Sequence, residues 1–471
     1  MCVSCISNKH KSDTRLIFFM NIIVVGCGKI GTTILSSLVA EGHNVVALDS
    51  NPNTINEITN LYDAIGICGN GNDCDTLSEA GVEKAELFVA VTGSDEFNML
   101  SCFLARRMGA KHTIARIRNP EYNDQNLGFI KKQLGLSMAI NPDLLAAQEL
   151  FNILKLPSAA KIETFSRRDF EMIELKLRQE SVLDGVSLIE LRKKYDVKLL
   201  VCVVQRDNEV FIPDGSFVLK SGDKIGITAT TSEILRFLKM LGVMQKQARN
   251  IMILGGSRTA YYLSKLLMGI GNTVKIVEKD HKRCLELSET LPNAVIINGD
   301  GAGQELLNEE GLSSMDAFIS LTGMDEENIL ISFYAAAQNV PKVISKVNRD
   351  EFMYLAEKIG LDCTISPKNI ISDILVRYAR ALENSLGSNV ETLYQIMDGK
   401  AEALEFNIVA DSAVTEIPLK DMKLKPNTLI AGIMRGRRII IPSGDDLILP
   451  EDKVVIITSG YKLNDISDIL L

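Results

Sequence analysis

One stretch near the start of the chain indicates the fold. Residues 21–31 read Asn21-Ile22-Ile23-Val24-Val25-Gly26-Cys27-Gly28-Lys29-Ile30-Gly31. A run of β-branched residues leads into Gly-x-Gly-x-x-Gly, and the pattern that follows predicts a helix over 32–41. Asp49 ends the next β-branched run. A strand, a glycine turn, a helix and an acidic residue about 20 positions on are typical of a βαβ unit that binds a dinucleotide.

The same pattern occurs twice, which predicts a duplication. Segments of the first half recur at an offset of 229 or 230 residues in the second half: 21–26 at 250–255, 91–98 at 321–328, 115–118 at 345–348, and 212–215 at 441–444. Each half therefore carries the same two-part unit, and we expect four domains.

The first part of each unit alternates short apolar runs with helical patterns, as parallel α/β sheets do. The expected strands are 22–25, 45–48, 64–68, 87–91 and 114–117, and again 251–254, 274–277, 294–297, 317–321 and 343–347. The second part has strands expected at 171–177, 199–204 and 224–228 and a helix at 187–194. The predicted fold is α/β, with two Rossmann-like doubly wound parallel sheets, each followed by a small α+β domain.

The predicted boundaries follow from this pattern. They are an extension over 1–19, a first Rossmann domain over 20–142, a connecting helix and small domain over 143–245, a second Rossmann domain over 246–367, and a second connecting helix and small domain over 368–471. The connecting helices are expected at 143–154 and 369–383. Met20 directly precedes the first strand, so we favour it over Met1 as the start of translation.

Composition limits the function classes. The 471 residues are 46% hydrophobic and 24% charged, with a net charge of −9, which argues against a nucleic-acid binder. No apolar run is long enough to span a membrane. Nine scattered cysteines indicate reduced thiols, and the Cys2-x-x-Cys5 pair has no second pair near it to complete a metal site. We expect no metal.

The glycines of the first loop have distinct physical roles. Gly26 permits the tight turn, Gly28 lets the backbone approach a diphosphate, and Gly31 lets the helix pack closely on the sheet. Backbone N–H groups of the loop, with Cys27, Lys29 and Ile30 between the glycines, would hold the phosphate charge at the helix N-terminus. Asp49 would accept the ribose hydroxyls and repel a 2′-phosphate, which favours NAD or an adenosine nucleotide over NADP. The alternative is a glycine turn that only packs helix on sheet.

The second loop is degenerate. It reads Gly255-Gly256-Ser257-Arg258-Thr259-Ala260, with Glu278 in the acidic position. Ser257 replaces the glycine of closest approach, so a diphosphate would be held less tightly. Two interpretations stay open: a second site that takes a different nucleotide, and a retained fold with a weakened site.

Three further residues are candidates for the first site. Thr92 and Gly93 follow the fourth strand, where ligands of doubly wound sheets bind; the alternative is that this segment only caps the next helix through Ser94 or Asp95. Arg116 ends the fifth strand and would pair with a phosphate; the alternative is a solvated surface cation.

Catalytic groups are not apparent. None of the four histidines recurs at the repeat offset or accompanies a candidate acid or nucleophile. A dehydrogenase needs an acid or base and a substrate domain beside the nicotinamide, and the small second parts are short for that task. We therefore expect a nucleotide sensor rather than an enzyme. An NAD-dependent oxidoreductase and a nucleotide-binding scaffold without a channel partner are the alternatives.

From Met20 onward the chain closely resembles the TrkA family, the cytosolic regulatory subunits of bacterial Trk potassium-uptake systems. The resemblance rests on the first glycine loop with Asp49, the paired segments 91–98 and 321–328, Ile114-Ala115-Arg116-Ile117-Arg118, and the tandem order of an RCK-N and an RCK-C domain, each present twice. Residues 1–19 and the degenerate second loop depart from the family pattern.

The resemblance implies a function. It implies a cytoplasmic protein, peripheral on the inner face of the membrane, that binds NAD(H) and the adenine nucleotides ATP and ADP, and gates a separate TrkH-type potassium-translocating subunit. It further implies a homo-oligomeric ring, with a tetramer as the expectation. By the family pattern, the first site uses Gly26 to Ile30, Asp49, Thr92, Gly93 and Arg116, and the second uses the Gly255 loop and Glu278.

Overall fold

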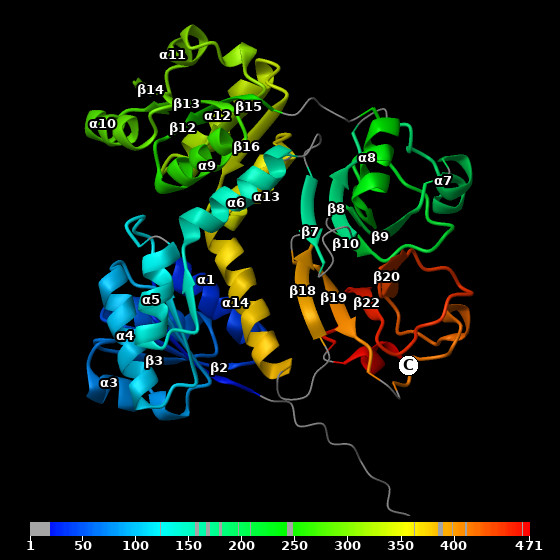
Figure 1. The fold of residues 1–471 in the computed structure, drawn as a ribbon, viewed down its shortest axis with the longest axis horizontal. Coiled ribbons are helices and arrows are strands. Elements are labelled where there is room, and N and C mark those ends of the chain that lie inside the picture. Colours follow the sequence, from blue (N-terminus) through cyan, green and yellow to red (C-terminus); the bar gives the residue numbers. More distant parts are fainter. Residues whose placement is uncertain are drawn as a thin grey trace, which may run out of the picture. The chain divides into compact units, whose positions relative to one another are not determined.

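The computed structural model describes most of the chain. The described residues are 19–122, 124–155, 160–165, 170–178, 181–195, 197–207, 209–242, 248–361, 363–384, 390–397, 399–409, 412–463 and 465–471. They form two compact units, the described parts of Met1–Ala115 with Ile130–Met138 and of Arg116–Phe129 with Ala139–Leu471. Of the helices in these ranges, none has the length and apolar character that a membrane span requires. Figure 1 follows the elements along the chain.

The first sheet has the predicted doubly wound order, β3-β2-β1-β4-β5-β6. Its strands are β1 (Asn21–Val25), β2 (Asn44–Asp49), β3 (Ile65–Cys68), β4 (Leu87–Ala90), β5 (His112–Arg116) and β6 (Met138–Ile140). β1 pairs in parallel with β2 on one side and β4 on the other. The chain order reverses between these neighbours of β1, and doubly wound sheets bind their ligands at such a point.

The helices of this copy connect the strands. They are α1 (Lys29–Ala40), α2 (Pro52–Leu61), α3 (Cys74–Glu79), α4 (Asp95–Met108) and α5 (Asp124–Leu134), with a 3-10 turn at Val82–Lys84. α1 begins three residues before the predicted start at Thr32, directly after its N-cap residue Gly28. The helix N-terminus therefore lies inside the glycine loop.

The second sheet repeats the order, as β14-β13-β12-β15-β16-β17. Its strands are β12 (Asn250–Leu254), β13 (Thr273–Glu278), β14 (Val295–Asn298), β15 (Ala317–Ser320), β16 (Lys342–Lys346) and β17 (Thr364–Ile365). Its helices are α9 (Arg258–Gly269), α10 (His281–Thr290), α11 (Gln304–Glu309), α12 (Asp325–Ala337) and α13 (Asp350–Lys358), with a 3-10 turn at Leu312–Ser314. The predicted duplication of the Rossmann domain is confirmed.

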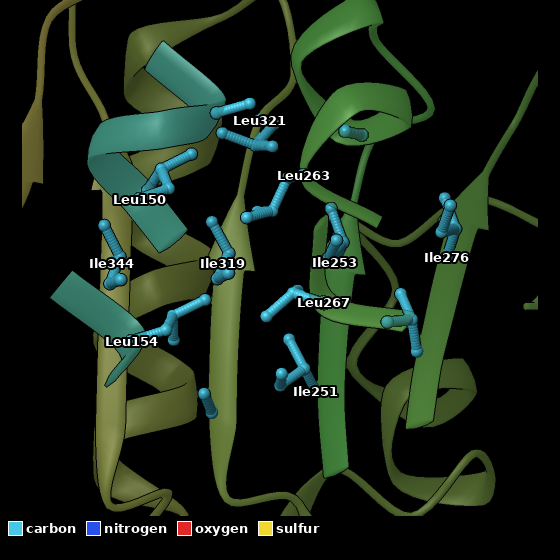
Figure 2. Close-up of a cluster of buried hydrophobic side chains, with 14 of the residues drawn as sticks. Leu150, Leu154, Ile251, Ile253, Leu263, Leu267, Ile276, Ile319, Leu321 and Ile344 are labelled. Atoms are coloured by element: carbon cyan, nitrogen blue, oxygen red, sulfur yellow. The ribbon is translucent and has the colours of Figure 1, made fainter. Parts of the chain in front are cut away.

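The connecting helix α6 (Pro142–Lys155) packs on this second sheet, although it follows the first one in the chain. Leu150 and Leu154 of α6 join Leu263 of α9 and Ile319 and Ile344 of the sheet in one buried cluster (Figure 2). Burial of each leucine side chain contributes about 1.5–3 kcal/mol. Segments more than 100 residues apart therefore share one core.

The two small domains are built from five-stranded sheets with antiparallel pairing, of order β10-β9-β11-β8-β7 and β18-β19-β22-β20-β21. The elements of the first are β7 (Ala160–Thr164), β8 (Phe170–Lys176), α7 (Leu188–Tyr195), β9 (Leu199–Arg206), β10 (Glu209–Phe211), β11 (Lys224–Thr230) and α8 (Thr231–Met240). The elements of the second are β18 (Val390–Ile396), β19 (Ala401–Asn407), β20 (Thr428–Arg435), β21 (Arg438–Ile440) and β22 (Lys453–Thr458), with 3-10 turns at Leu419–Asp421 and Ile466–Ile469. Helix α14 (Pro367–Asn384) precedes it.

The two small domains share a buried core that includes Met172, Met397 and Val455. Two hydrogen bonds join the sheets: Thr228 Oγ1 donates to the carbonyl oxygen of Ala431 at 2.8 Å, and the N–H of Met397 donates to Glu174 Oε1 at 2.9 Å. The duplicated small domains are therefore held together within one chain.

Candidate functional site

The first glycine loop has the predicted backbone geometry. Gly26 has φ +88°, and a Cβ atom there would lie 2.8 Å from the backbone of Thr92. A Cβ at Gly31 would lie 2.0 Å from the carbonyl oxygen of Gly26, so α1 packs directly against the loop. These two positions explain the need for glycine in the turn and in the close helix packing.

Gly28 differs from the other two glycines. It has φ −70°, and within the described part of the chain no heavy atom beyond its immediate neighbours lies within 4 Å of a Cβ built there. Gly28 is exposed, and the described residues give the first turn of α1 no side-chain cap, as an anion site at a helix N-terminus requires.

Asp49 ends β2 and faces this loop. The N–H of Cys27 donates to Asp49 Oδ2 at 2.7 Å, and the N–H of Asn51 donates to Oδ1 at 2.9 Å. The carboxylate therefore fixes the loop. It also lies at the end of β2, where the adenosine ribose of a dinucleotide would bind. Burial raises the pKa of the Cys27 thiol to about 12, so this cysteine stays protonated and is a poor nucleophile.

Thr92 and Gly93 follow β4, at the carboxyl end of the strands, where doubly wound sheets bind their ligands. The N–H and the hydroxyl of Thr92 both donate to Asn98 Oδ1, at 2.8 and 2.7 Å. Ser94 caps α4 by accepting the N–H of Phe97 at 3.2 Å, which confirms the capping role proposed for it. Asn98 is fully buried and positions Thr92. It was not among the predicted site residues, although its recurrence as Asn328 was a usable signal.

Arg116 is the last residue of β5 and is only 8% exposed. Its alternative interpretation as a solvated surface cation is therefore wrong. Its counterpart Lys346 ends β16, where its Nζ donates to the carbonyl oxygen of Leu321 at 3.3 Å. Burial lowers the pKa of Lys346, although the charges of Asp143 and Asp325 act in the opposite direction.

The second loop has the same backbone course with different side chains. Gly255 has φ +93°, and Ser257 (φ −63°, ψ 168°) matches Gly28 (φ −70°, ψ −169°). The N–H of Gly256 donates to Glu278 Oε2 at 2.6 Å, as that of Cys27 does to Asp49. The loop shape is therefore retained in the second copy.

Side chains already form hydrogen bonds at the N-terminus of α9, which follows the second loop. Ser257 Oγ accepts the N–H of Ala260 at 3.3 Å, and the hydroxyl of Thr259 donates to Asp143 Oδ1 at 3.1 Å. Arg258 is the first residue of α9. An incoming phosphate would compete with Ser257 for a backbone donor, which gives a physical reason for the expected weaker hold on a diphosphate.

A metal centre is not evident. Among the described residues no group of three or more His, Cys, Asp or Glu side chains is placed to hold a metal ion. Cys2 and Cys5 lie outside the described residues. The chemistry that the two loops support is recognition of a phosphorylated adenosine by backbone N–H groups and a carboxylate.

Comparison with known proteins agrees with this architecture. The sequence matches the TrkA-N domain family over residues 22–142 and 251–367, and the TrkA-C domain family over 172–242 and 403–471. A "Trk system potassium uptake protein TrkA homolog" of Archaeoglobus fulgidus is 31% identical over 451 residues, which are 96% of this chain and 100% of that protein. The "Trk system potassium uptake protein TrkA" of Vibrio alginolyticus is 29% identical over 94% of this chain and 96% of its own length.

Solved structures show the same fold. The "GsuK Channel" aligns with a TM-score of 0.61 at 16% identity, covering 94% of this chain and 77% of that chain. A structure titled "GsuK channel bound to NAD" aligns over the same shares with a TM-score of 0.60. The TrkA-N and TrkA-C matches cover both copies of the unit, and the similarity to curated TrkA proteins spans nearly the whole chain. The chain therefore belongs to the TrkA family.

Proposed function

We propose that this chain is the nucleotide-sensing subunit of a Trk-type potassium uptake system. It binds NAD(H) at the first glycine loop, binds adenine nucleotides including ATP and ADP, and gates a separate potassium-translocating membrane subunit of the TrkH type. Family membership supports the assignment to potassium uptake, and the NAD-bound GsuK channel of the same fold supports the ligand class.

One observation carries the nucleotide assignment. The first turn of α1 has no side-chain cap among the described residues and opens at Gly28, while Asp49 stands 2.7 Å from the same loop. The helix N-terminus supplies donors for the diphosphate, and the carboxylate supplies an acceptor for the ribose hydroxyls. We place the first site at Gly26 to Gly31, Asp49, Thr92, Gly93 and Arg116.

The proposed control follows from linkage. A nucleotide shifts the equilibrium between two states of the assembly only if its affinity for them differs. We propose that nucleotide exchange changes the relative orientation of the Rossmann domains in a homo-oligomeric ring, with four chains as the expected number. Deformation of this ring on the cytoplasmic face of the membrane would then bias the pore between closed and open.

Calorimetric titration of the purified full chain with NADH, NAD, ATP and ADP tests the nucleotide assignment. Gly28→Glu places a carboxylate at the N-terminus of α1, where its Cβ meets no described atom within 4 Å, so it should abolish binding at the first loop. Gly128→Glu in α5 is a matched control, because its Cβ position is equally open. It should bind as the wild type does.

The outcomes separate the alternatives. Two classes of site with different nucleotide preference support a duplicated sensor, and one NAD(H) site leaves the second copy as scaffold. Binding that survives in Gly28→Glu contradicts the assignment of the first loop. Turnover of a substrate with NAD would favour the oxidoreductase alternative.

A further inference from the structure

The two copies differ in charge at the turn that follows their second strand. In the first copy, residues 49–57 carry two acidic side chains, Asp49 and Glu57, and no basic one. In the second copy, the corresponding residues 278–286 carry three acidic side chains and three basic ones, Lys279, Lys282 and Arg283. The turn between β13 and α10, together with the first residues of α10, therefore carries three cations that the first copy lacks.

The guanidinium of Arg283 lies on the second glycine loop. Arg283 Nε donates to the carbonyl oxygen of Gly256 at 2.7 Å, and Nη1 donates to Glu286 Oε2 at 2.9 Å. The Arg283 side chain is 31% exposed, and Lys279 and Lys282 are exposed. The cations therefore stand beside the loop where solvent and a ligand reach them.

The acidic groups of this turn accept hydrogen bonds from backbone N–H groups. Glu278 accepts from Gly256 at 2.6 Å and from Asp280 at 2.8 Å. Asp280 caps α10 by accepting the N–H groups of Lys282 and Arg283 at 2.8 and 3.2 Å. Asp49 accepts the equivalent pair of N–H groups in the first copy, so the two sites differ in the cations beside the carboxylate and not in the bonding of the carboxylate itself.

The end of the second strand is where the adenosine ribose of a dinucleotide binds, and a nearby arginine accommodates a phosphate on its 2′-oxygen. We propose that the second site selects an adenine dinucleotide that carries this phosphate, NADP(H), whereas the first site selects NAD(H). The inference rests on the proposed function and adds that the second glycine loop is one of the nucleotide sites. Ser257 already occupies one N–H donor at the N-terminus of α9, so this site holds a diphosphate less tightly than the first site does. Contacts to the extra phosphate make up for part of this lost binding free energy.

The test measures dinucleotide affinity at the second site alone. In the full chain with Gly28→Glu, NADP should bind about tenfold or more tightly than NAD, which corresponds to about 1.4 kcal/mol. Arg283→Thr and Lys282→Asn restore the first-copy residues at two positions. Each should lower the affinity for NADP more than the affinity for NAD, and so reduce the preference for NADP. Lys265→Asn, on the exposed surface of α9, removes the same charge outside this turn and should leave the preference intact.

Salt provides an independent readout that a purely structural role of Arg283 would not give. The preference for NADP should shrink as ionic strength rises, because contacts between exposed charges are screened. Equal or weaker binding of NADP than of NAD in Gly28→Glu overturns this inference and leaves the proposed function intact. Loss of both dinucleotides in Gly28→Glu, with wild-type binding present, also overturns it, since the second loop is then empty. Absence of binding in the wild type refutes the proposed function itself.

Discussion

Replacing Gly28 by serine gives the first loop the N-cap residue that the second loop has. Nucleotide affinity and the free energy of unfolding should then change in opposite directions. Ser257 has nearly the backbone angles of Gly28, and a Cβ at Gly28 meets open space in the described part of the chain. The new hydroxyl should accept the N–H of Gly31, as Ser257 Oγ accepts that of Ala260. Serine is a slightly better N-cap than glycine, so the free energy of unfolding should rise by about 0.3 kcal/mol.

Nucleotide affinity should fall in the same variant. The hydroxyl takes a backbone donor that would otherwise hold a charged phosphate, and one such hydrogen bond is worth about 1.5–3 kcal/mol. Affinity for NADH at the first site should therefore fall by about ten- to a hundredfold. Titration calorimetry and urea denaturation of the same preparation measure the two quantities.

Two outcomes with Gly28→Ser would contradict binding of the diphosphate at the N-terminus of α1. Unchanged NADH affinity with a normal urea midpoint would mean that the diphosphate is not held at the N-terminus of α1. A parallel loss of affinity and stability would mean that the substitution damages the fold. Only weaker binding with retained stability agrees with the structure.

Four further predictions follow from the structure. Asp49→Ala should lose most of the ribose-dependent affinity, and unchanged NADH binding in calorimetry would contradict the ribose assignment of this carboxylate. Leu150→Ala, which opens a cavity in the core under the second sheet, should lower the free energy of unfolding by about 2–5 kcal/mol; a thermal midpoint equal to that of the wild type would refute the packing of α6 on that sheet. Burial lowers the pKa of Lys342 to about 8 from an ordinary 10.5, so between these pH values the unfolded state binds more protons than the folded state. The free energy of unfolding should therefore rise with pH over this range by up to about 3 kcal/mol. Urea denaturation should show a smaller rise for Lys342→Met, and identical pH profiles for the two proteins would argue against the burial. Iodoacetamide should modify exposed Cys68 long before buried Cys27, as mass spectrometry of the digest would report, and equal rates would contradict the closed loop.

Much of the fold was predictable because each pattern occurs twice. The five main strands of each Rossmann sheet were expected close to their observed bounds, since apolar runs between helical patterns leave few alternatives. The short strands β6, β10, β17 and β21 were missed because two or three residues carry no periodic signal, and the five-residue strand β7 was missed as well. The packing of α6 on the second sheet was also missed, because an amphipathic helix does not reveal which sheet covers it.

The site was predicted only in part. Gly26, Gly31 and Asp49 follow from a motif whose spacing reflects backbone geometry, and the turn and close packing are as expected. Asn98 and Arg283 were missed because their roles depend on partners six and 27 residues away. The recurrence of Asn98 as Asn328 was a usable signal, whereas the hydrogen bond from Arg283 to the second glycine loop leaves no pattern in the chain. Whether the residues of either site bind a nucleotide stays a prediction.

Potassium flux shows whether a nucleotide at the first glycine loop controls the membrane subunit. The full chain would be combined with a TrkH-type membrane subunit in liposomes, and flux would be measured with NADH, NAD, ATP and ADP in turn. We predict that flux differs between nucleotides with the wild-type chain and with Gly128→Glu, and that the NAD(H)-dependent difference disappears with Gly28→Glu. Identical flux with every nucleotide, or a difference that survives in Gly28→Glu, would contradict the account.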